Sequence, residues 1–224
     1  MNKFFFILTF ISFLFSCKKK EQEVFSSNQN YFGLEQGRFC IYDVYEINHD
    51  DAINVHDTLH YQLKTWIDSI YIDNEGRTNH QFKRFVREND SSSWSLIDIY
   101  TALVNGNNGE LVEENQRKVK LVFPISANSS WNPNAYNNLG EESSAYSRVH
   151  QSLSLNGYNF DSTSTVLQKD FFSLVDYRRQ WEIYASNVGL IYKMYKDLDI
   201  ENFDTLNVVK GNELHYSLIK YGAE

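Results

Sequence analysis

Histidine and aspartate, both common metal ligands, gather in one polar stretch of the chain. This stretch contains His49, His56, His60, Asp50, Asp51 and Asp57. His56 and His60 are four residues apart, a spacing that presents two imidazoles to one metal only on a helix. Apolar and polar residues alternate from Leu59 onward, which predicts a strand instead. We therefore expect a solvated loop followed by a strand-edge histidine, and we predict no metal site here.

A second acidic group could in principle supply carboxylate oxygens to calcium. It consists of Asp197, Asp199, Glu201 and Asp204. The run lacks the glycine-pinned loop of an EF-hand. A charged, solvated connection is the favoured interpretation, and no cofactor is expected.

Tryptophan beside amide side chains can bind a sugar, because the ring stacks on the sugar and the amides reach its hydroxyls. Trp131 and Asn132 lie in an Asn- and Ser-rich stretch, residues 127–142, which predicts a long loop. Trp66 lies on the polar side of an alternating strand. These three are the candidate ligand-binding residues. The alternative is that the tryptophans cover an edge of the core.

The sequence assigns no catalytic residue. It contains no G-x-S-x-G elbow, P-loop, dinucleotide fingerprint or H-E-x-x-H motif. The formal net charge of −8 argues against nucleic acid as a partner, since such proteins present a basic face. A binding or accessory role is therefore favoured over an enzyme.

The N-terminus has the pattern of a secretory leader. Lys3 makes the start basic, and residues 4–15 form an apolar run broken only by Thr9 and Ser12. This run is too short to cross a bilayer core, which needs about 20 residues. Its length and flanks are typical of a signal peptide, so residues 1–16 are predicted to be removed.

The leader ends at a cysteine, in the segment Leu14-Phe15-Ser16-Cys17. This segment resembles the lipobox of bacterial lipoproteins, which has an aliphatic residue, a small residue and then the cysteine; Phe15 is bulkier than the usual residue at its position. The resemblance implies acylation of Cys17 by chains such as palmitate. Two or more such chains anchor a protein stably, whereas one binds reversibly. Cys17 is the predicted lipidation site, with an unmodified secreted start as the alternative.

Residues 17–30 are predicted to form the lipidated cysteine and a flexible tether, because they are charged and then polar. An acylated Cys17 leaves Cys40 without an intramolecular partner. Cys40 lies between Phe39 and Ile41 in a strand-like run, so we expect it to pack as a small buried apolar residue.

The remainder, residues 31–224, has the pattern of a single β-rich domain. Aromatic residues make up 16% of the sequence, and such side chains suit pleated surfaces. Eight or nine strands are predicted; the segments include Phe39–Ile47, 59–68, Phe82–Arg87, Trp94–Leu103, Val119–Phe123, Tyr146–Leu155, Thr163–Gln168, Gly189–Lys196 and Leu214–Tyr221. Phe171–Tyr184 is the one predicted helix. The expected fold is mainly antiparallel β, either a sandwich or a curved half-barrel, with at most one short helix.

Three segments together resemble an uncharacterised family of Bacteroidota outer-membrane lipoproteins. They are Tyr31-Phe32-Gly33-Leu34, Leu121-Val122-Phe123-Pro124-Ile125 with Trp131-Asn132, and Glu182-Ile183-Tyr184-Ala185 with Val188-Gly189-Leu190-Ile191-Tyr192-Lys193. In that family a proline usually stands in the place of Gly33. The resemblance implies a β fold and an envelope location, and it supplies no catalytic residue.

The expected function is that of a membrane-anchored, non-catalytic accessory or binding lipoprotein, held on the outer membrane and facing either the periplasm or the exterior. One alternative is a carrier or sensor of lipid-like ligands in the concave face of a half-barrel, an analogy of fold. Another is a surface glycan-binding lipoprotein that uses Trp131. The expected partners are the membrane, through the lipid anchor, and an envelope protein, lipid or glycan.

Overall fold

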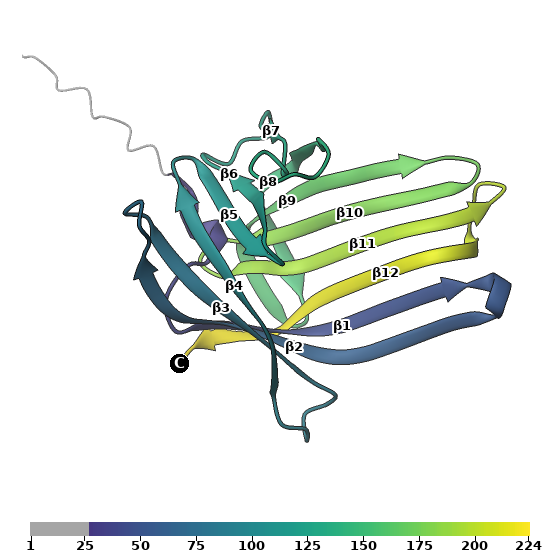
Figure 1. Cartoon of the computed structure of the whole chain (residues 1–224), viewed down its shortest axis with the longest axis horizontal. Helices are drawn as coiled ribbons and strands as arrows, with labels where there is room; N and C mark the ends of the chain where they lie inside the picture. The colour runs from purple at the N-terminus through teal and green to yellow at the C-terminus, as the bar shows by residue number, and fades with distance from the viewer. Residues whose placement is uncertain (1–26) are drawn as a thin grey trace, which may run out of the picture.

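Twelve antiparallel strands form one curved sheet in the computed structural model, which describes residues 27–224 (Figure 1). The strands are β1 (Arg38–Asp50), β2 (Val55–Ile72), β3 (Thr78–Arg87), β4 (Ser95–Asn105), β5 (Asn108–Glu113), β6 (Gln116–Val122), β7 (Ser130–Trp131), β8 (Ser144–Leu155), β9 (Tyr158–Phe172), β10 (Asp176–Ala185), β11 (Gly189–Glu201) and β12 (Asp204–Ala223). Two short 3-10 helices, η1 (Gln29–Phe32) and η2 (Asp51–Ile53), accompany them.

The sheet consists of two meanders joined at the centre. Its order is β6-β5-β4-β3-β2-β1-β12-β11-β10-β9-β8-β7, so nearly every strand pairs with its neighbour in sequence. The exception is the pair of β1 and β12, which brings the first and last strands together (Figure 1, blue and yellow). The two halves of the chain thus share one continuous sheet.

The two outer edges of the sheet curl toward one another. Val119 of β6 donates its backbone N–H to the carbonyl of Pro133 at 2.9 Å. The hydroxyl of Tyr146, in β8, donates to the carbonyl of Val122 at 2.9 Å. The sheet is therefore nearly closed, which confirms the mainly antiparallel β fold. Of the two predicted architectures, the curved half-barrel is right and the two-layer sandwich is wrong.

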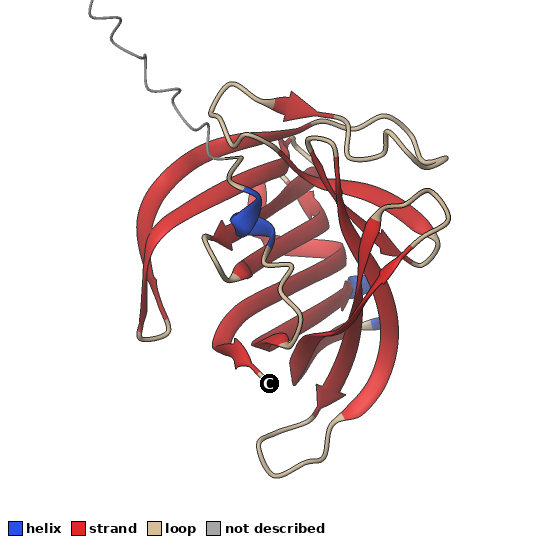
Figure 2. Ribbon diagram, turned by 90° about the vertical axis from the view of Figure 1, so that its left-hand side faces the viewer, coloured by secondary structure: helices blue, strands red, loops and turns tan. Residues whose placement is uncertain are grey.

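The helix η1 lies inside the curl of the sheet (Figure 2, blue). Tyr31 and Phe32 are buried there. The Tyr31 hydroxyl lies 2.8 Å from Nδ1 of His150 and 2.6 Å from Oγ of Ser162. A buried aromatic pair with its polar group satisfied fixes this segment against β8 and β9.

Gly33 follows η1 and packs against the turn between β10 and β11. Its φ is 67°, which proline, fixed near −65°, cannot adopt. A Cβ at this position would lie 2.5 Å from the carbonyl oxygen of Val188. The left-handed φ and this close approach both favour glycine at position 33.

We expect Gly33→Ala to destabilise the fold by about 2 kcal/mol or more, because left-handed strain of roughly 1–2 kcal/mol adds to the backbone clash. Gly76→Ala is the matched control, since Gly76 has a φ of 76° with nothing within 4 Å of its Cβ position. Urea unfolding should show the larger loss for Gly33→Ala. Equal losses of unfolding free energy in the two variants would show that the close approach to Val188 contributes nothing to stability.

The predicted helix Phe171–Tyr184 is wrong. Its residues form the end of β9, a turn and most of β10. The turn is closed by the N–H of Ser173, which donates to the carbonyl of Asp176 at 2.8 Å. β10 then pairs on both sides, with β9 and β11. Pairing on two sides, together with aromatic and β-branched residues, outweighs an imperfect helical spacing.

The predicted strands are found, but the structure contains 12 strands, more than the eight or nine predicted. The sequence pattern does not predict β5, because the turn signal at residues 105–109 overlaps the start of this strand. Asn108 and Gly109 are the first two residues of β5. The predicted loop of residues 127–142 contains only the two-residue strand β7.

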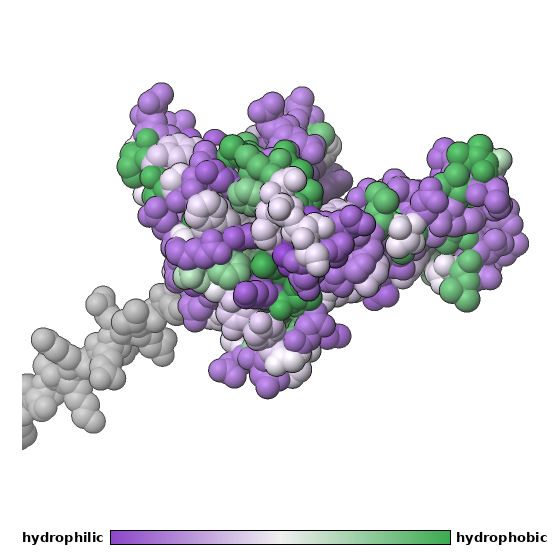
Figure 3. Space-filling view, turned by 90° about the horizontal axis from the view of Figure 1, so that it is seen from below, coloured by the Kyte–Doolittle hydropathy of each residue, from purple (hydrophilic) through white to green (hydrophobic). Residues whose placement is uncertain are grey.

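Apolar side chains are exposed at the far end of the long strands (Figure 3). They include Phe171, Phe172, Val175, Phe203 and Leu206. The rings of Phe172 and Phe203 are 5.6 Å apart, so the tips of two hairpins meet there. Within residues 27–224, no helix has the length and apolar character needed to cross a membrane.

Candidate functional site

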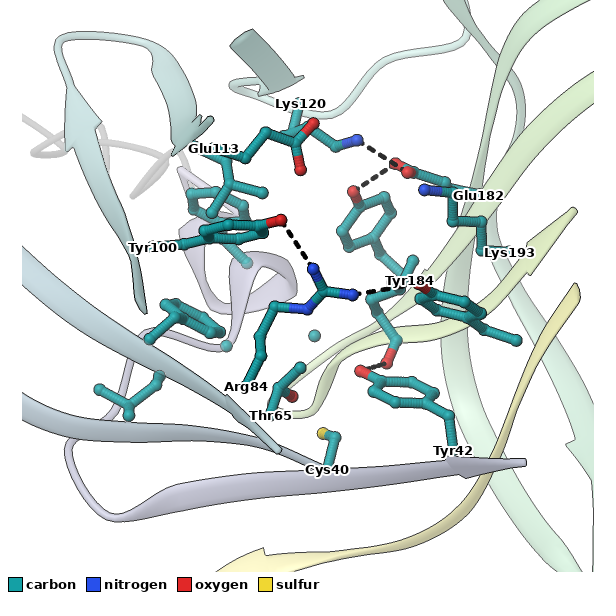
Figure 4. Close-up of a pocket in the computed structure, with 18 of the residues that line it drawn as sticks. Cys40, Tyr42, Thr65, Arg84, Tyr100, Glu113, Lys120, Glu182, Tyr184 and Lys193 are labelled. Carbon is teal, nitrogen blue, oxygen red and sulfur yellow. Dashed lines mark hydrogen bonds and ion pairs between the residues drawn. The ribbon is translucent and has the colours of Figure 1, made fainter. Parts of the chain in front are cut away.

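A cavity of about 290 Å³ lies within the curl of the sheet (Figure 4). This volume is just under the range of about 300–1,000 Å³ that is typical of small-molecule pockets. Its walls come from both meanders and from the segment after η1. The curvature of the sheet therefore brings together side chains that are far apart in the sequence.

Strand alternation determines which side chains reach the cavity. Residues two apart in a strand point to the same face, and the cavity is lined by such pairs. The pairs are Cys40 and Tyr42 in β1, Leu63 and Thr65 in β2, Lys118 and Lys120 in β6, and Glu182 and Tyr184 in β10. Arg84, Tyr100, Lys193 and Tyr216 come from β3, β4, β11 and β12.

An ion pair crosses the cavity wall between the two halves of the chain. Nζ of Lys120 lies 2.7 Å from Oε1 of Glu182, and the Tyr184 hydroxyl donates to Oε2 of Glu182 at 2.6 Å (Figure 4). The Glu182 side chain is 2% exposed and that of Lys120 is 13% exposed. Burial would raise the pKa of Glu182, but Lys120 and then Lys193 outweigh it and lower the pKa below its usual value. Glu182 is therefore ionised at neutral pH.

A second carboxylate, Glu113, also faces the lysines. Its Oε1 lies 3.1 Å from Nζ of Lys118. Burial would raise the pKa of Glu113, but Lys120, Lys118 and Lys193 outweigh it and hold the pKa at about 2. The electrostatic potential around Glu113 is thus strongly positive.

Arg84 projects into the centre of the cavity (Figure 4). Its Nη1 donates to the hydroxyl of Tyr100 at 2.7 Å, and its Nη2 donates to the hydroxyl of Tyr216 at 3.2 Å. Nη1 also lies 3.3 Å from Oδ2 of Asp98, whose side chain is 40% exposed. The guanidinium is held by hydroxyl groups and by one half-exposed carboxylate.

The other part of the lining is apolar. It includes Phe39, Leu63, Ile67, Phe82 and Val188. Cys40 borders the cavity and is buried, as its sequence context predicts. Burial raises the pKa of the Cys40 thiol to about 11, so the thiol is not a nucleophile at neutral pH.

The charge on Glu113 makes stability depend on pH. Its folded pKa is below its usual value of 4.5, so its contribution is fully present above about pH 4.5 and is lost as the pH falls through about 2. We expect Glu113→Gln to be less stable than the wild type at pH 7 and to approach it as the pH is lowered from 4.5 toward 3. Urea unfolding at several pH values measures this.

Glu88→Gln, at an exposed position outside the cavity, is the control and should leave the unfolding free energy unchanged. A constant difference between wild type and Glu113→Gln at every pH would contradict the low pKa of Glu113.

The candidate ligand-binding residues lie outside the cavity lining. Trp66 follows Thr65 in β2 and therefore projects from the opposite face. Its ring centroid is 5.8 Å from Nζ of Lys64 and 5.6 Å from Nζ of Lys83. Its Nε1 is buried without a hydrogen-bond partner among residues 27–224.

Trp131 is the last residue of β7, and Asn132 begins the loop that follows it. Nε1 of Trp131 donates to the carbonyl of Val119 at 2.9 Å, and the ring packs 5.0 Å from that of Tyr146. Oδ1 of Asn132 accepts the N–H groups of Asn134 and Glu142. These contacts are intramolecular and bind the loop to the sheet edge.

The histidines lie in strands, since the loop between β1 and β2 is only residues 51–54. Nδ1 of His49 is 3.1 Å from Nδ1 of His56, and Nε2 of His49 is 3.3 Å from Oε1 of Glu213. His60 pairs with Asp43 at 2.6 Å. The described chain contains no group of three His, Cys, Asp or Glu residues arranged to hold a metal ion.

The acidic run also differs from its prediction. Asp197, Asp199 and Glu201 lie in β11 and Asp204 begins β12, so the run is strand rather than a connection. Arg178 of β10 pairs with Asp197 at 2.5 Å and with Asp199 at 2.8 Å. These cross-strand ion pairs stabilise the carboxylates within the sheet. Cys17 lies outside the described residues.

No family model matches the chain, and no curated protein matches it. Among solved structures it is similar to the crystal structure of a candidate lipoprotein from Parabacteroides distasonis, with 12% sequence identity and a TM-score of 0.45. The similarity covers 86% of this chain and 98% of that one.

Proposed function

We propose that the protein is a binding lipoprotein of the bacterial cell envelope, anchored on the outer membrane by acylated Cys17, and that the cavity holds its ligand. The observation that carries the binding role is the cluster of Lys120, Glu182 and Lys193 on the cavity wall. Buried ion pairs are often no more stabilising than apolar residues of similar volume. A fold that required only a core would fill this space with such residues.

Binding fits the lining better than catalysis does. No histidine lines the cavity within residues 27–224, and the Cys40 thiol is protonated at neutral pH. The cavity instead brings together fixed charges, tyrosine hydroxyls and an apolar wall. A few polar groups that orient a ligand against apolar surface are typical of binding pockets.

The two alternatives from the sequence have less support. A carrier for a whole acyl chain needs an extended apolar lining, whereas the apolar residues here share a cavity of about 290 Å³ with Arg84, Lys120 and Lys193. At Trp131, the candidate glycan site, the indole N–H already donates to the carbonyl of Val119 and the ring packs 5.0 Å from that of Tyr146.

Native mass spectrometry of the full-length protein extracted from its own membranes tests the binding role. We expect a fraction of the protein to carry a small bound molecule. Thr65→Trp fills the cavity and should abolish that species, whereas Ser95→Trp, at an exposed site in β4, should keep it. A bound species of equal abundance in Thr65→Trp would place the ligand elsewhere, and no bound species in any variant would overturn the proposal.

The anchor is tested by the intact mass of the mature N-terminus. We expect a chain that begins at Cys17 and carries two or three acyl groups. An unmodified chain that begins beyond Cys17 would contradict the anchored role.

A further inference from the structure

Lys193 is a cation of the cavity lining that has no carboxylate partner among residues 27–224. No carboxylate in the described part of the chain lies within 4.0 Å of Nζ of Lys193, although Lys120 and Lys118 are paired with Glu182 and Glu113. Nζ of Lys193 lies over the ring of Tyr216, 5.4 Å from its centroid. Burial lowers the pKa of Lys193, and Glu182 offsets this only in part. Glu182 and Glu113, the carboxylates whose charges act on Lys193, are already paired with Lys120 and Lys118.

Lys193 is close to a second cation that is only partly neutralised. Tyr216 links the two, because its ring lies under Lys193 while its hydroxyl accepts from Nη2 of Arg84. The charge of Arg84 lowers the pKa of Lys193 further, which reflects their proximity. Five cationic side chains line the cavity against three carboxylates, and two of the five, Arg84 and Arg38, pair with carboxylates outside the lining, Asp98 and Glu35. Among residues 27–224, Lys193 is therefore the lining cation that has no carboxylate within 4.0 Å.

The apolar lining restricts the kind of ligand that can supply a negative charge to Lys193. A hydrated inorganic anion would neutralise Lys193, but it would leave the partly exposed apolar residues of the lining, Phe82, Leu111 and Leu190, against water. A ligand with an apolar part covers those residues as well, and apolar burial contributes about 25 cal/mol per Å². The volume of about 290 Å³ limits that part to a compact group.

We propose that the cavity binds a compact amphipathic anion. Its charged group lies at Lys193 and Arg84, and its apolar part lies against Phe82, Leu111 and Leu190. This inference rests on the proposed function and specifies the ligand class for the same site. Lys193 is the residue that distinguishes an anion from a neutral molecule of the same shape.

The test compares two probes that differ in charge, 2-naphthoate and its neutral amide, 2-naphthamide. Calorimetry on the full-length acylated protein in lipid nanodiscs, with empty nanodiscs as the blank, gives both affinities. We expect the wild type to bind 2-naphthoate at least tenfold more tightly than 2-naphthamide. Lys193→Met should abolish that preference, and Lys193→Arg should retain most of it.

Lys210→Met is the matched control, because Lys210 is exposed on β12 and outside the cavity. It should leave both affinities unchanged, and thermal unfolding confirms that each variant is folded. Equal affinity for the two probes, no binding of 2-naphthoate, or an unchanged preference in Lys193→Met would overturn the inference. If one of these outcomes occurs but native mass spectrometry still finds a bound molecule that is absent from Thr65→Trp, the ligand is not an anion of this class and the proposed binding function stands.

Discussion

Replacing Glu182 with alanine is expected to lower the free energy of unfolding by about 3–5 kcal/mol, the usual cost of removing one partner from a buried ion pair. The change leaves Lys120 without its 2.7 Å partner and removes the acceptor of the Tyr184 hydroxyl. It also removes the carboxylate that favours the charged form of Lys193. Urea unfolding followed by tryptophan fluorescence measures the loss.

Two further variants separate charge from packing. Glu182→Gln keeps a hydrogen-bond acceptor and should lose less than Glu182→Ala. The double variant Lys120→Met with Glu182→Leu replaces the pair by apolar side chains of similar size, so it should recover most of the lost stability. A loss below about 1 kcal/mol in Glu182→Ala would show that the pair is solvated and that the cavity wall is not built as described.

Replacing Cys17 with serine is expected to move nearly all of the protein from the membrane to the soluble fraction. Each buried methylene contributes about 0.8 kcal/mol to membrane binding, so the loss of two or more acyl chains removes the anchor. The three lysines at positions 18–20 add only about 1 kcal/mol each near anionic lipid, and high salt screens them. Fractionation after a high-salt wash measures the shift.

The comparison requires mature chains that differ only at residue 17. The serine variant is therefore expressed behind a leader that is cleaved without acylation. Cys40→Ala is the control, since it removes the other cysteine and should leave the protein in the membrane fraction. Equal membrane association of the Cys17→Ser variant and the wild type would contradict lipid anchoring.

Much of the fold could be predicted because strand patterns are local. The alternation from Leu59 and the turn residues around Gly76 and Gly157 predicted strands that the structure contains. The predicted helix failed because its spacing was ambiguous, and pairing with β9 and β11 decides the outcome. The choice between a sandwich and a half-barrel depends on contacts between β6 and β8, which no local pattern reveals.

The cavity could not be predicted, although part of its signal was visible. Lys120, Glu182 and Lys193 each lie between apolar neighbours in a strand, as Val119 and Leu121 flank Lys120. A charged residue in this position indicates that its side chain does not face an apolar core, but the sequence does not show whether it faces solvent, a partner charge or a cavity. The meeting of these three residues depends on the curvature of the sheet, which brings β6 opposite β10.

The most direct test of a ligand-binding cavity is a crystal structure of the protein purified from its own envelope. We expect compact density within the curl of the sheet, in contact with Lys193 and Arg84 and distinct from water. A cavity collapsed onto its side chains, with Lys193 paired directly to Glu182 and no room for a ligand, would contradict this expectation.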